Sequence, residues 1–290
     1  MKNNFSKYQG LGNDFIIFDA RGTNLDNFFI ENKGNFIERL CNRNFGIGAD
    51  GIILVLESKN KCFVKMKIFN SDGSEPEMCG NGIRCLIAFL NDNHEVKDKS
   101  EIRIETKAGL IITSIDGNKN IKVNMGEPIL SPEDIPTNLL MNNLTIPNGK
   151  ITINDQTLNV YAASMGNPHM IVFVDKIENI PFEDWGRYLE KHNTFPNDTN
   201  VHFVELIDKS NIKVKVWERG CGPTLACGTG ACACLVVTAS LGKTLNKANV
   251  YLPGGKLEIE WPNQAGPVLM QGPALKLSLI HISEPTRLRR

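Results

Sequence analysis

The stretch that decides the fold occurs twice in the chain. Residues 64–85 read VKMKIFNSDGSEPEMCGNGIRC, and 148 residues later residues 212–233 read IKVKVWERGCGPTLACGTGACA without a gap. Five of the 22 aligned positions are identical. Each copy begins with a run in which apolar residues alternate with lysines, and it continues through a polar loop and Cys-Gly-x-Gly to an apolar segment. The alternation predicts a strand, and the apolar segment predicts a helix. A repeat of this length indicates duplicated domains rather than a solenoid.

The elements around the repeat predict the fold class. After the first copy, apolar residues lie at positions 83, 86, 87 and 90, one helix face, and the segment 231–241 is apolar nearly all round, as in a buried helix. Strand candidates surround them at 15–19, 51–56, 101–105, 110–115 and 121–125, and at 151–153, 158–163, 170–174, 201–207 and 256–260. Strands dominate and no βαβ alternation is evident, so we expect an α+β fold of two pseudo-symmetric domains. Each would be a curled, mostly antiparallel sheet wrapped around a central helix.

Domain boundaries follow from the same pattern. The proline-containing stretch 126–147 is typical of a connector and irregular structure. We place the first domain at residues 1–125, with a strand returning to it at about 271–278, and the second at residues 126–270.

Composition excludes several classes of function. The 290 residues include 32 Lys+Arg and 32 Asp+Glu, so there is no basic field to hold nucleic acid or an anionic membrane. No apolar run approaches the roughly 18–20 residues of a membrane helix, and the first residues do not resemble a secretory signal. We therefore expect a cytoplasmic protein.

The eight cysteines do not suggest disulfides or a metal site. Structural disulfides are disfavoured in reducing compartments. Zinc sites usually show paired cysteines with two to four intervening residues, whereas Cys232-Ala-Cys234 is too tight and the other gaps are atypical. We expect no metal.

Cys79 and Cys227 are the candidates for chemistry because each stands directly before a helix that begins with glycine. Unpaired N–H groups and the positive end of the helix dipole lie there, which favours a thiolate. A buried cysteine at a glycine-rich helix start is the alternative for either site alone. Two equivalent acid/base groups suit the inversion of a stereocentre, where one removes a proton and the other delivers one to the opposite face. A nucleophilic Cys–His hydrolase would not explain the duplication.

These residues carry a resemblance to a known family. NSDGSEPEMCGNGIR at 70–84 and WERGCGPTLACGTGA at 217–231 resemble the two signature segments of the diaminopimelate epimerases. GLGNDF at 10–15, GIGADG at 46–51, GNPH at 166–169 and Asn200-Val201 are similar to the remaining motifs and follow in the same order. The resemblance spans about residues 5–275.

The resemblance implies a cofactor-independent isomerase that interconverts LL- and meso-2,6-diaminopimelate in lysine biosynthesis, and a homodimer. Cys79 and Cys227 would be the acid/base pair, one ionised and one protonated. Backbone amides at Gly80-Asn81 and Gly228-Thr229 would bind the α-carboxylate and stabilise the charge that develops in the transition state. If the two sulfur atoms face each other across a closed cleft, mild oxidation would join them.

The remaining site residues would bind the other end of the substrate or tune the thiols. Arg219 would pair with the distal carboxylate, and Glu218 would accept from an ammonium group. In the family, the positions of His169 and Glu218 are associated with tuning of the thiols. Neutral amide contacts would come from Asn13, Asn70, Asn167 and Asn200.

Two features depart from the family pattern. Many members have glutamine where this chain has Gly51, so one substrate contact is expected to be absent. The family's last strand resembles 274–277 and is followed by an acidic, glycine-containing end, whereas residues 278–290 read SLIHISEPTRLRR. We expect this tail to be appended, non-native sequence without strand pattern.

Two other readings remain open. One is a cysteine-pair racemase of the proline or hydroxyproline type. Glu218-Arg219 with Asn70 distinguishes the two enzymes, because these residues suit a substrate that has a second zwitterionic end. The other is a non-catalytic thiol or metal-binding module. It would take up metal, and any turnover would be unaffected by replacement of either cysteine.

Overall fold

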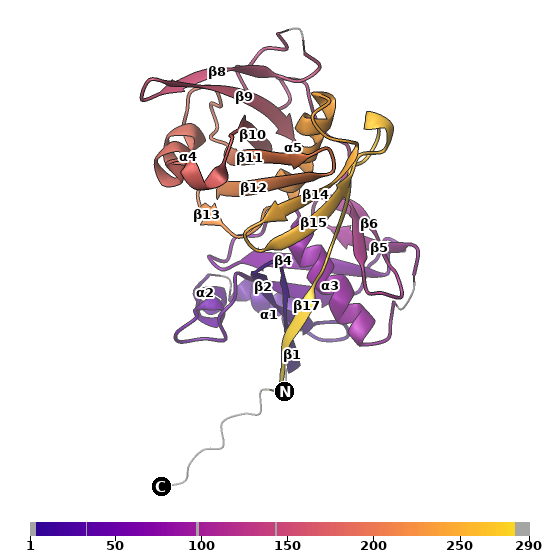
Figure 1. The fold of residues 1–290 in the computed structure, drawn as a ribbon. Coiled ribbons are helices and arrows are strands. Elements are labelled where there is room, and N and C mark those ends of the chain that lie inside the picture. The colour runs from indigo at the N-terminus through magenta and orange to yellow at the C-terminus, as the bar shows by residue number, and fades with distance from the viewer. Residues whose placement is uncertain (1–3, 33, 97–98, 143, 282–290) are drawn as a thin grey trace. The chain divides into compact units, whose positions relative to one another are not determined.

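The computed structural model describes the chain except for residues 1–3, 33, 97–98, 143 and 282–290 (Figure 1). It divides into two compact units, one formed by Met1–Val123 with Pro273–Arg290 and one by Asn124–Gly272. The expected α+β class is confirmed, since strands outnumber helices in both units. Among the described residues, none of the helices has the length and apolar character needed to cross a membrane.

The first unit is one mixed sheet in the order β17-β1-β2-β3-β4-β5-β6-β7. The pairs β2–β3 and β4–β5 are parallel, and the other pairs in this order are antiparallel. The strands are β1 (Asn4–Gly10), β2 (Asn13–Asp19), β3 (Gly51–Leu56), β4 (Val64–Asn70), β5 (Ile102–Thr106), β6 (Gly109–Ile115), β7 (Ile121–Asn124) and β17 (Leu275–His281).

The second unit repeats this plan in the order β8-β9-β10-β11-β12-β14-β15-β16. Its parallel pairs, β10–β11 and β12–β14, occupy the same places in the order as those of the first unit. The strands are β8 (Asn148–Ile153), β9 (Gln156–Ser164), β10 (Pro168–Phe173), β11 (Asn200–Asp208), β12 (Asn211–Glu218), β14 (Lys247–Leu252), β15 (Gly255–Glu260) and β16 (Leu269–Gly272), with β13 (Gly222–Thr224) as an addition on β12. The duplication seen in the sequence therefore extends to strand pairing.

A helix that follows Cys-Gly-x-Gly is central to each unit. Helix α3 (Gly80–Asp92) packs on β1, β2, β3, β4 and β17, and α5 (Gly228–Ser240) packs on β9, β10, β11, β14, β15 and β16. Contacts with strands that span a sheet require that sheet to curve around its helix. Our expectation of no βαβ unit was wrong: α3 connects the parallel pair β4–β5, and α5 connects β12–β14. Two parallel neighbours need such a crossover, because a tight turn cannot join them.

Helices on the outer face explain why the inner strands are apolar on both sides. Strand β3, GIILVL, is buried at every position. Ile52 and Leu54 pack in a cluster with Phe29 of α1 (Leu25–Glu31) and Ile37 of α2 (Asn35–Cys41). In the second unit, Phe203 of β11 packs in the same way against α4 (Phe182–Glu190).

The C-terminal strand corrects one expectation. Ser278–His281, which we expected to lack strand character, continue β17, and their backbone pairs antiparallel with β1 from Asn4 to Lys7. Ladder bonds use backbone groups, so this pairing does not require side-chain alternation. Residues 282–290 lie outside the described residues, and the appended origin of the tail stays a hypothesis.

Candidate active site

Each candidate thiol is the N-cap of its unit's central helix. Cys79 and Cys227 both have extended backbone, and their carbonyls accept the first helical bonds, from Ile83 and Ala231. The sulfur of Cys79 accepts from the amide of Gly82 at 3.4 Å, and that of Cys227 accepts from Gly230 at 3.3 Å. A donor and the positive helix end thus lie at each sulfur and favour its thiolate form.

The glycine whose amide donates to each sulfur has less space around it in the second unit than in the first. A Cβ at Gly82 would lie 3.1 Å from a methyl group of Ile68. A Cβ at Gly230 would lie 2.0 Å from Cε1 of the buried His202 ring. The ring of His202 therefore packs directly on the backbone of the first turn of α5.

Amide groups lie beside Cys79, and a carboxylate supports one of them. Its sulfur is 3.9 Å from Oδ1 of Asn13, which also accepts from Nδ2 of Asn81 at 3.2 Å. The Asn13 amide is fixed in turn, because its Nδ2 donates to Asp50 at 2.9 Å. Asn13, Asn81 and the Gly80 backbone are thus brought together at this helix start.

An ion-pair network supports that arrangement from behind. Arg43 bridges Asp14 and Asp50 with contacts of 2.7 Å to each, and Lys7 contacts Asp14 at 2.8 Å. Burial raises the pKa of Asp14, but hydrogen bonds from Arg43 and Lys7 outweigh it and hold the pKa below its usual value. The charged carboxylates hold the loop that carries Asn13.

Arg84 ties the start of α3 to the returning strand. Its side chain is fully buried and donates to Oδ1 of Asn81 at 2.8 Å and to the carbonyls of Gly80 and Pro273, each at 3.3 Å. A buried guanidinium needs several acceptors, and these bonds fix Asn81 and the polypeptide that enters β17.

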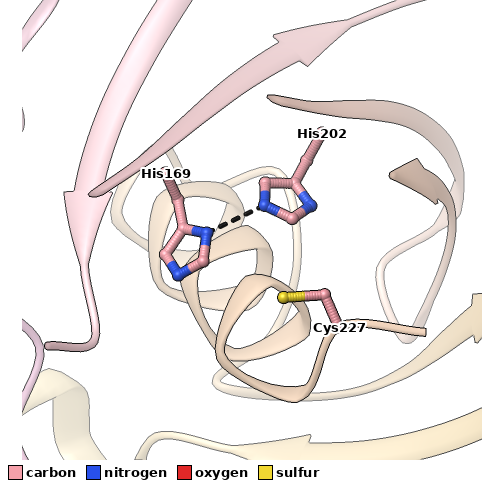
Figure 2. A group of neighbouring side chains, drawn as sticks. All are labelled: His169, His202 and Cys227. Atoms are coloured by element: carbon pink, nitrogen blue, oxygen red, sulfur yellow. Dashed lines mark hydrogen bonds between the residues drawn. The ribbon is translucent and has the colours of Figure 1, made fainter. Parts of the chain in front are cut away.

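Two imidazoles lie beside Cys227 (Figure 2). Nδ1 of His169 and Nε2 of His202 are 2.9 Å apart, and Nε2 of His169 is 3.0 Å from Oδ1 of Asn167. Because the amide oxygen can only accept, Nε2 of His169 carries hydrogen and Nδ1 accepts from His202. Nδ1 of His202 is then unprotonated, and this buried atom has no hydrogen-bond partner in the described part of the chain.

Burial keeps both rings neutral. It lowers the pKa of His202 to about 3. The pKa of His169 also lies well below its usual value, through burial first and then through His202 and Arg219. The two neutral rings therefore place lone pairs and N–H groups beside the sulfur without adding a positive charge.

Buried groups position the Glu218-Arg219 loop. Glu190 on α4 accepts from Nε1 of Trp217 and from the amide of Gly220, both at 2.7 Å. Oδ1 of Asn200 accepts from the amide of Arg219 at 3.1 Å. The Arg219 side chain is exposed, and its guanidinium donates to the carbonyl of Asn197 at 3.0 Å.

Glu218 lies in a less polar environment than its neighbour. The hydroxyl of Thr224 donates to it at 2.6 Å. Burial raises the pKa of Glu218 above its usual value, although this hydrogen bond opposes the shift.

The remaining expected residues are placed as follows. The Thr229 hydroxyl is 3.4 Å from the sulfur of Cys227, and Gly228 is the first, buried residue of α5. Asn200 also donates to the carbonyl of Pro168 at 2.9 Å. Asn70 is exposed at the end of β4 and donates to Ser74 at 2.9 Å, apart from the Asn13 cluster in the contacts described.

Sequence reasoning missed three residues of these arrangements: His202, Glu190 and Thr224. His202 lies within a strand that the alternation predicted, two positions from Asn200, and a histidine at an inward position of that strand was the available signal. Glu190 lies in α4, which we did not predict. No local motif marks Thr224.

The other thiols contrast with the two caps. All eight cysteines are present as thiols. Burial raises the pKa of Cys85 and of Cys234 well above the usual value, which makes them poor sources of thiolate. Cys232 is buried in α5, and Cys221 is exposed.

Comparisons with known proteins show the family of the chain. A family model described as diaminopimelate epimerase matches residues 5–131 and 161–277. The chain is 84% identical over 277 residues to a diaminopimelate epimerase of Prochlorococcus marinus (strain NATL2A), covering 96% of this chain and 98% of that protein.

Solved structures show the same fold at low identity. A Bacillus anthracis phenazine biosynthesis protein of the PhzF family is 19% identical, with a TM-score of 0.69 over 98% of this chain and 99% of that chain. A hydroxyproline epimerase from Agrobacterium vitis is 12% identical, with a TM-score of 0.64 over 97% of this chain and 90% of that chain.

Proposed function

Because this chain belongs to the diaminopimelate epimerase family, we propose that it interconverts LL- and meso-2,6-diaminopimelate, as a step of lysine biosynthesis, with two cysteines as acid and base. The observation that carries the proposal is the equivalence of Cys79 and Cys227. Each caps a buried helix at the same place in a duplicated strand order. A single nucleophile would need one such cap, whereas a two-base inversion, with one group on each face of the carbon, uses two.

The proton transfers balance without a cofactor. The thiolate of one cysteine takes the α-proton and becomes a thiol. The thiol of the other cysteine gives its proton to the opposite face of the carbon and becomes the thiolate. The two residues exchange roles in the reverse direction, and the next turnover requires the starting protonation states to be restored by proton exchange.

The helix starts supply the stabilisation that a cofactor would otherwise provide. Amides at Gly80-Asn81 and Gly228-Thr229 are the groups we assign to the α-carboxylate and to the negative charge that develops during deprotonation. Asn81 is held for this task by Arg84 and Asn13. Donors held in advance cost no reorganisation at the moment of reaction.

Polar side chains would orient the substrate. Arg219, exposed and fixed through its backbone by Asn200, suits a carboxylate at the distal end. Glu218 would accept from an ammonium group. The family pattern assigns further amide contacts to Asn13, Asn70, Asn167 and Asn200.

Two groups would adjust the thiols. His169 lies in the imidazole pair beside Cys227, and we assign it to the proton balance of that sulfur. We assign Glu218 to the same task, because burial raises the pKa of its carboxyl above the usual value and makes the protonated form more accessible.

We further propose a cytoplasmic homodimer that needs no cofactor and no nucleic-acid or membrane partner. The equal numbers of basic and acidic residues support the exclusion of nucleic acid.

A substrate comparison tests the function against the proline-type alternative. The purified chain is incubated with LL-diaminopimelate, meso-diaminopimelate, L-proline and trans-4-hydroxy-L-proline, and the products are separated by chiral chromatography. We expect both diaminopimelate isomers to reach one equilibrium mixture and both prolines to stay unchanged. Epimerisation of a proline with inert diaminopimelate would favour the racemase and overturn the proposal.

A further inference from the structure

We propose that His169, His202 and Cys227 form a binding site for a thiophilic divalent cation such as Zn²⁺, and that its occupation blocks the thiol. The cysteine spacings gave no indication of metal, because two of the three ligands are histidines and all three are far apart in the sequence. Neighbouring parallel strands β10 and β11 carry the histidines, and the start of α5 carries the cysteine.

The geometry suits a small tetrahedral ion. One ligand atom from each residue lies within 4.8 Å of the others (Figure 2). Zn²⁺ binds nitrogen at about 2.0–2.1 Å and sulfur at about 2.3 Å, so the ligand atoms of a tetrahedral site are roughly 3.3–3.6 Å apart. The facing nitrogens of the two rings are already 2.9 Å apart. Small side-chain adjustments would form the site, with its fourth position open to water or to an added anion.

The hydrogen bonds supply lone pairs that the ion needs. Asn167 fixes the proton of His169 on Nε2, which leaves Nδ1 as an acceptor. His202 holds its proton on the facing Nε2, and its Nδ1 is buried without a partner in the described part of the chain, so the proton can move to Nδ1 and leave the Nε2 lone pair for the ion. Binding therefore releases one proton, from the thiol, and moves at most one proton within the ring of His202. A neutral Cys-SH and two neutral imidazoles become a thiolate and two imidazoles on the ion.

Cys79 offers a matched comparison within the same chain. It caps a helix in the same way, but the side chain 3.9 Å from its sulfur is the amide of Asn13, which in turn accepts from the amide of Asn81. Amides and a single thiolate are weak ligands for Zn²⁺, which prefers several sulfur and imidazole ligands. The ion should therefore distinguish the two thiols, although both stand at equivalent helix starts.

The experiment follows metal binding directly. Co²⁺, which takes zinc sites and shows a thiolate-to-metal charge-transfer band, is titrated into the intact chain, into Cys227→Ser, Cys79→Ser and His202→Asn. We expect the band in the unmodified chain and in Cys79→Ser, its loss in Cys227→Ser, and at least about tenfold weaker binding in His202→Asn. Circular dichroism checks that each variant is folded. If His202→Asn does not fold, the comparison of the two serine variants decides alone.

A second measurement concerns the blocked thiol, and this part rests on the proposed function. Zn²⁺ should inhibit epimerisation of diaminopimelate, and a chelator should restore it. An equally strong cobalt band in Cys227→Ser, or no band in the unmodified chain, would overturn the site. A normal band in a chain that does not epimerise diaminopimelate would leave the site intact and refute the proposed function instead.

Discussion

Gly230→Ala tests whether the His202 ring really packs on the first turn of α5. The added Cβ would lie 2.0 Å from Cε1 of the ring, whereas carbon atoms rest at about 3.5–4.0 Å, so the ring must retreat by roughly 1.5 Å. That movement would break its 2.9 Å bond to His169. Overpacking costs about 1–3 kcal/mol, and the buried groups left unpaired cost about 1–3 kcal/mol more. Alanine favours the helix by up to about 1 kcal/mol and offsets part of this cost, so we expect a loss of roughly 1–5 kcal/mol in the free energy of unfolding.

Gly82→Ala is the matched control, since the same position of the first helix meets a flexible methyl group at 3.1 Å. We expect it to lie within about 1 kcal/mol of the unmodified chain, because alanine also favours the helix by up to about 1 kcal/mol.

Urea unfolding measures the effect of Gly230→Ala. Tryptophan fluorescence reports on the second unit, which contains all three tryptophans, and circular dichroism reports on both units. Adding His202→Ala removes the ring that the new methyl group would strike. The free-energy loss of the double variant should therefore be smaller than the sum of the two single losses by about 0.5–3 kcal/mol. Additive effects, or equal costs at the two glycines, would refute the packing argument.

Three further changes address the surroundings of the site. Glu190→Ala leaves the Trp217 indole and the Gly220 amide without their buried acceptor. We expect a loss of roughly 2–4 kcal/mol in the free energy of unfolding in urea, and a higher KM. An unchanged KM would show that the Glu218-Arg219 loop does not depend on Glu190. Arg84→Met removes the donor to Asn81 and to two carbonyls; we expect a loss of about 2–4 kcal/mol, and unchanged stability would contradict the role of the buried guanidinium. His202 has a folded-state pKa lowered to about 3, so the unfolded chain takes up a proton below about pH 6.5 that the folded chain does not. Its contribution to stability is therefore lost as the pH falls from about 6.5 towards 3. In His202→Asn the fall should be shallower by up to about 1.4 kcal/mol per pH unit, measured by urea unfolding between pH 6.5 and 4.5. Parallel pH curves would contradict neutral burial of the ring.

The sequence predicted the elements that have a strong local pattern. Strand β3 was predicted with its exact bounds, since a short apolar run between turns has few alternatives. The start of α5 and its capping sulfur followed from Cys-Gly-x-Gly before an apolar run. Both features depend on neighbouring residues, so a single segment contains the information.

Other elements depend on distant partners. Helix α1 is short, with Phe29 as its buried residue, and it is stabilised by a cluster on the outer face of β2 and β3. Short helices are marginal without such packing, so their local pattern is weak. Ser278–His281 form a strand because β1 offers backbone groups to them. The absence of βαβ units was wrongly predicted, since parallel pairing is a property of two strands that no local pattern records.

The residues of the candidate site also fall into those marked by a local motif and those brought together by distant elements. Cys79, Cys227 and the amides beside them belong to motifs, so they could be named from the sequence. The contact between His169 and His202 arises because β10 and β11 run parallel, with His169 opposite Asn200 in register. The structure shows that register. It also shows that Glu190 of α4 supports the Arg219 loop.

The central claim is that two thiols act on opposite faces of one carbon. LL-diaminopimelate is incubated in D₂O with the unmodified chain, with Cys79→Ala and with Cys227→Ala, and NMR follows both loss of the α-proton signal and formation of the meso isomer. The account predicts deuterium in both isomers with the unmodified chain and no conversion to the meso isomer with either variant. Continued conversion by one of the alanine variants at a rate comparable to the unmodified chain would contradict it.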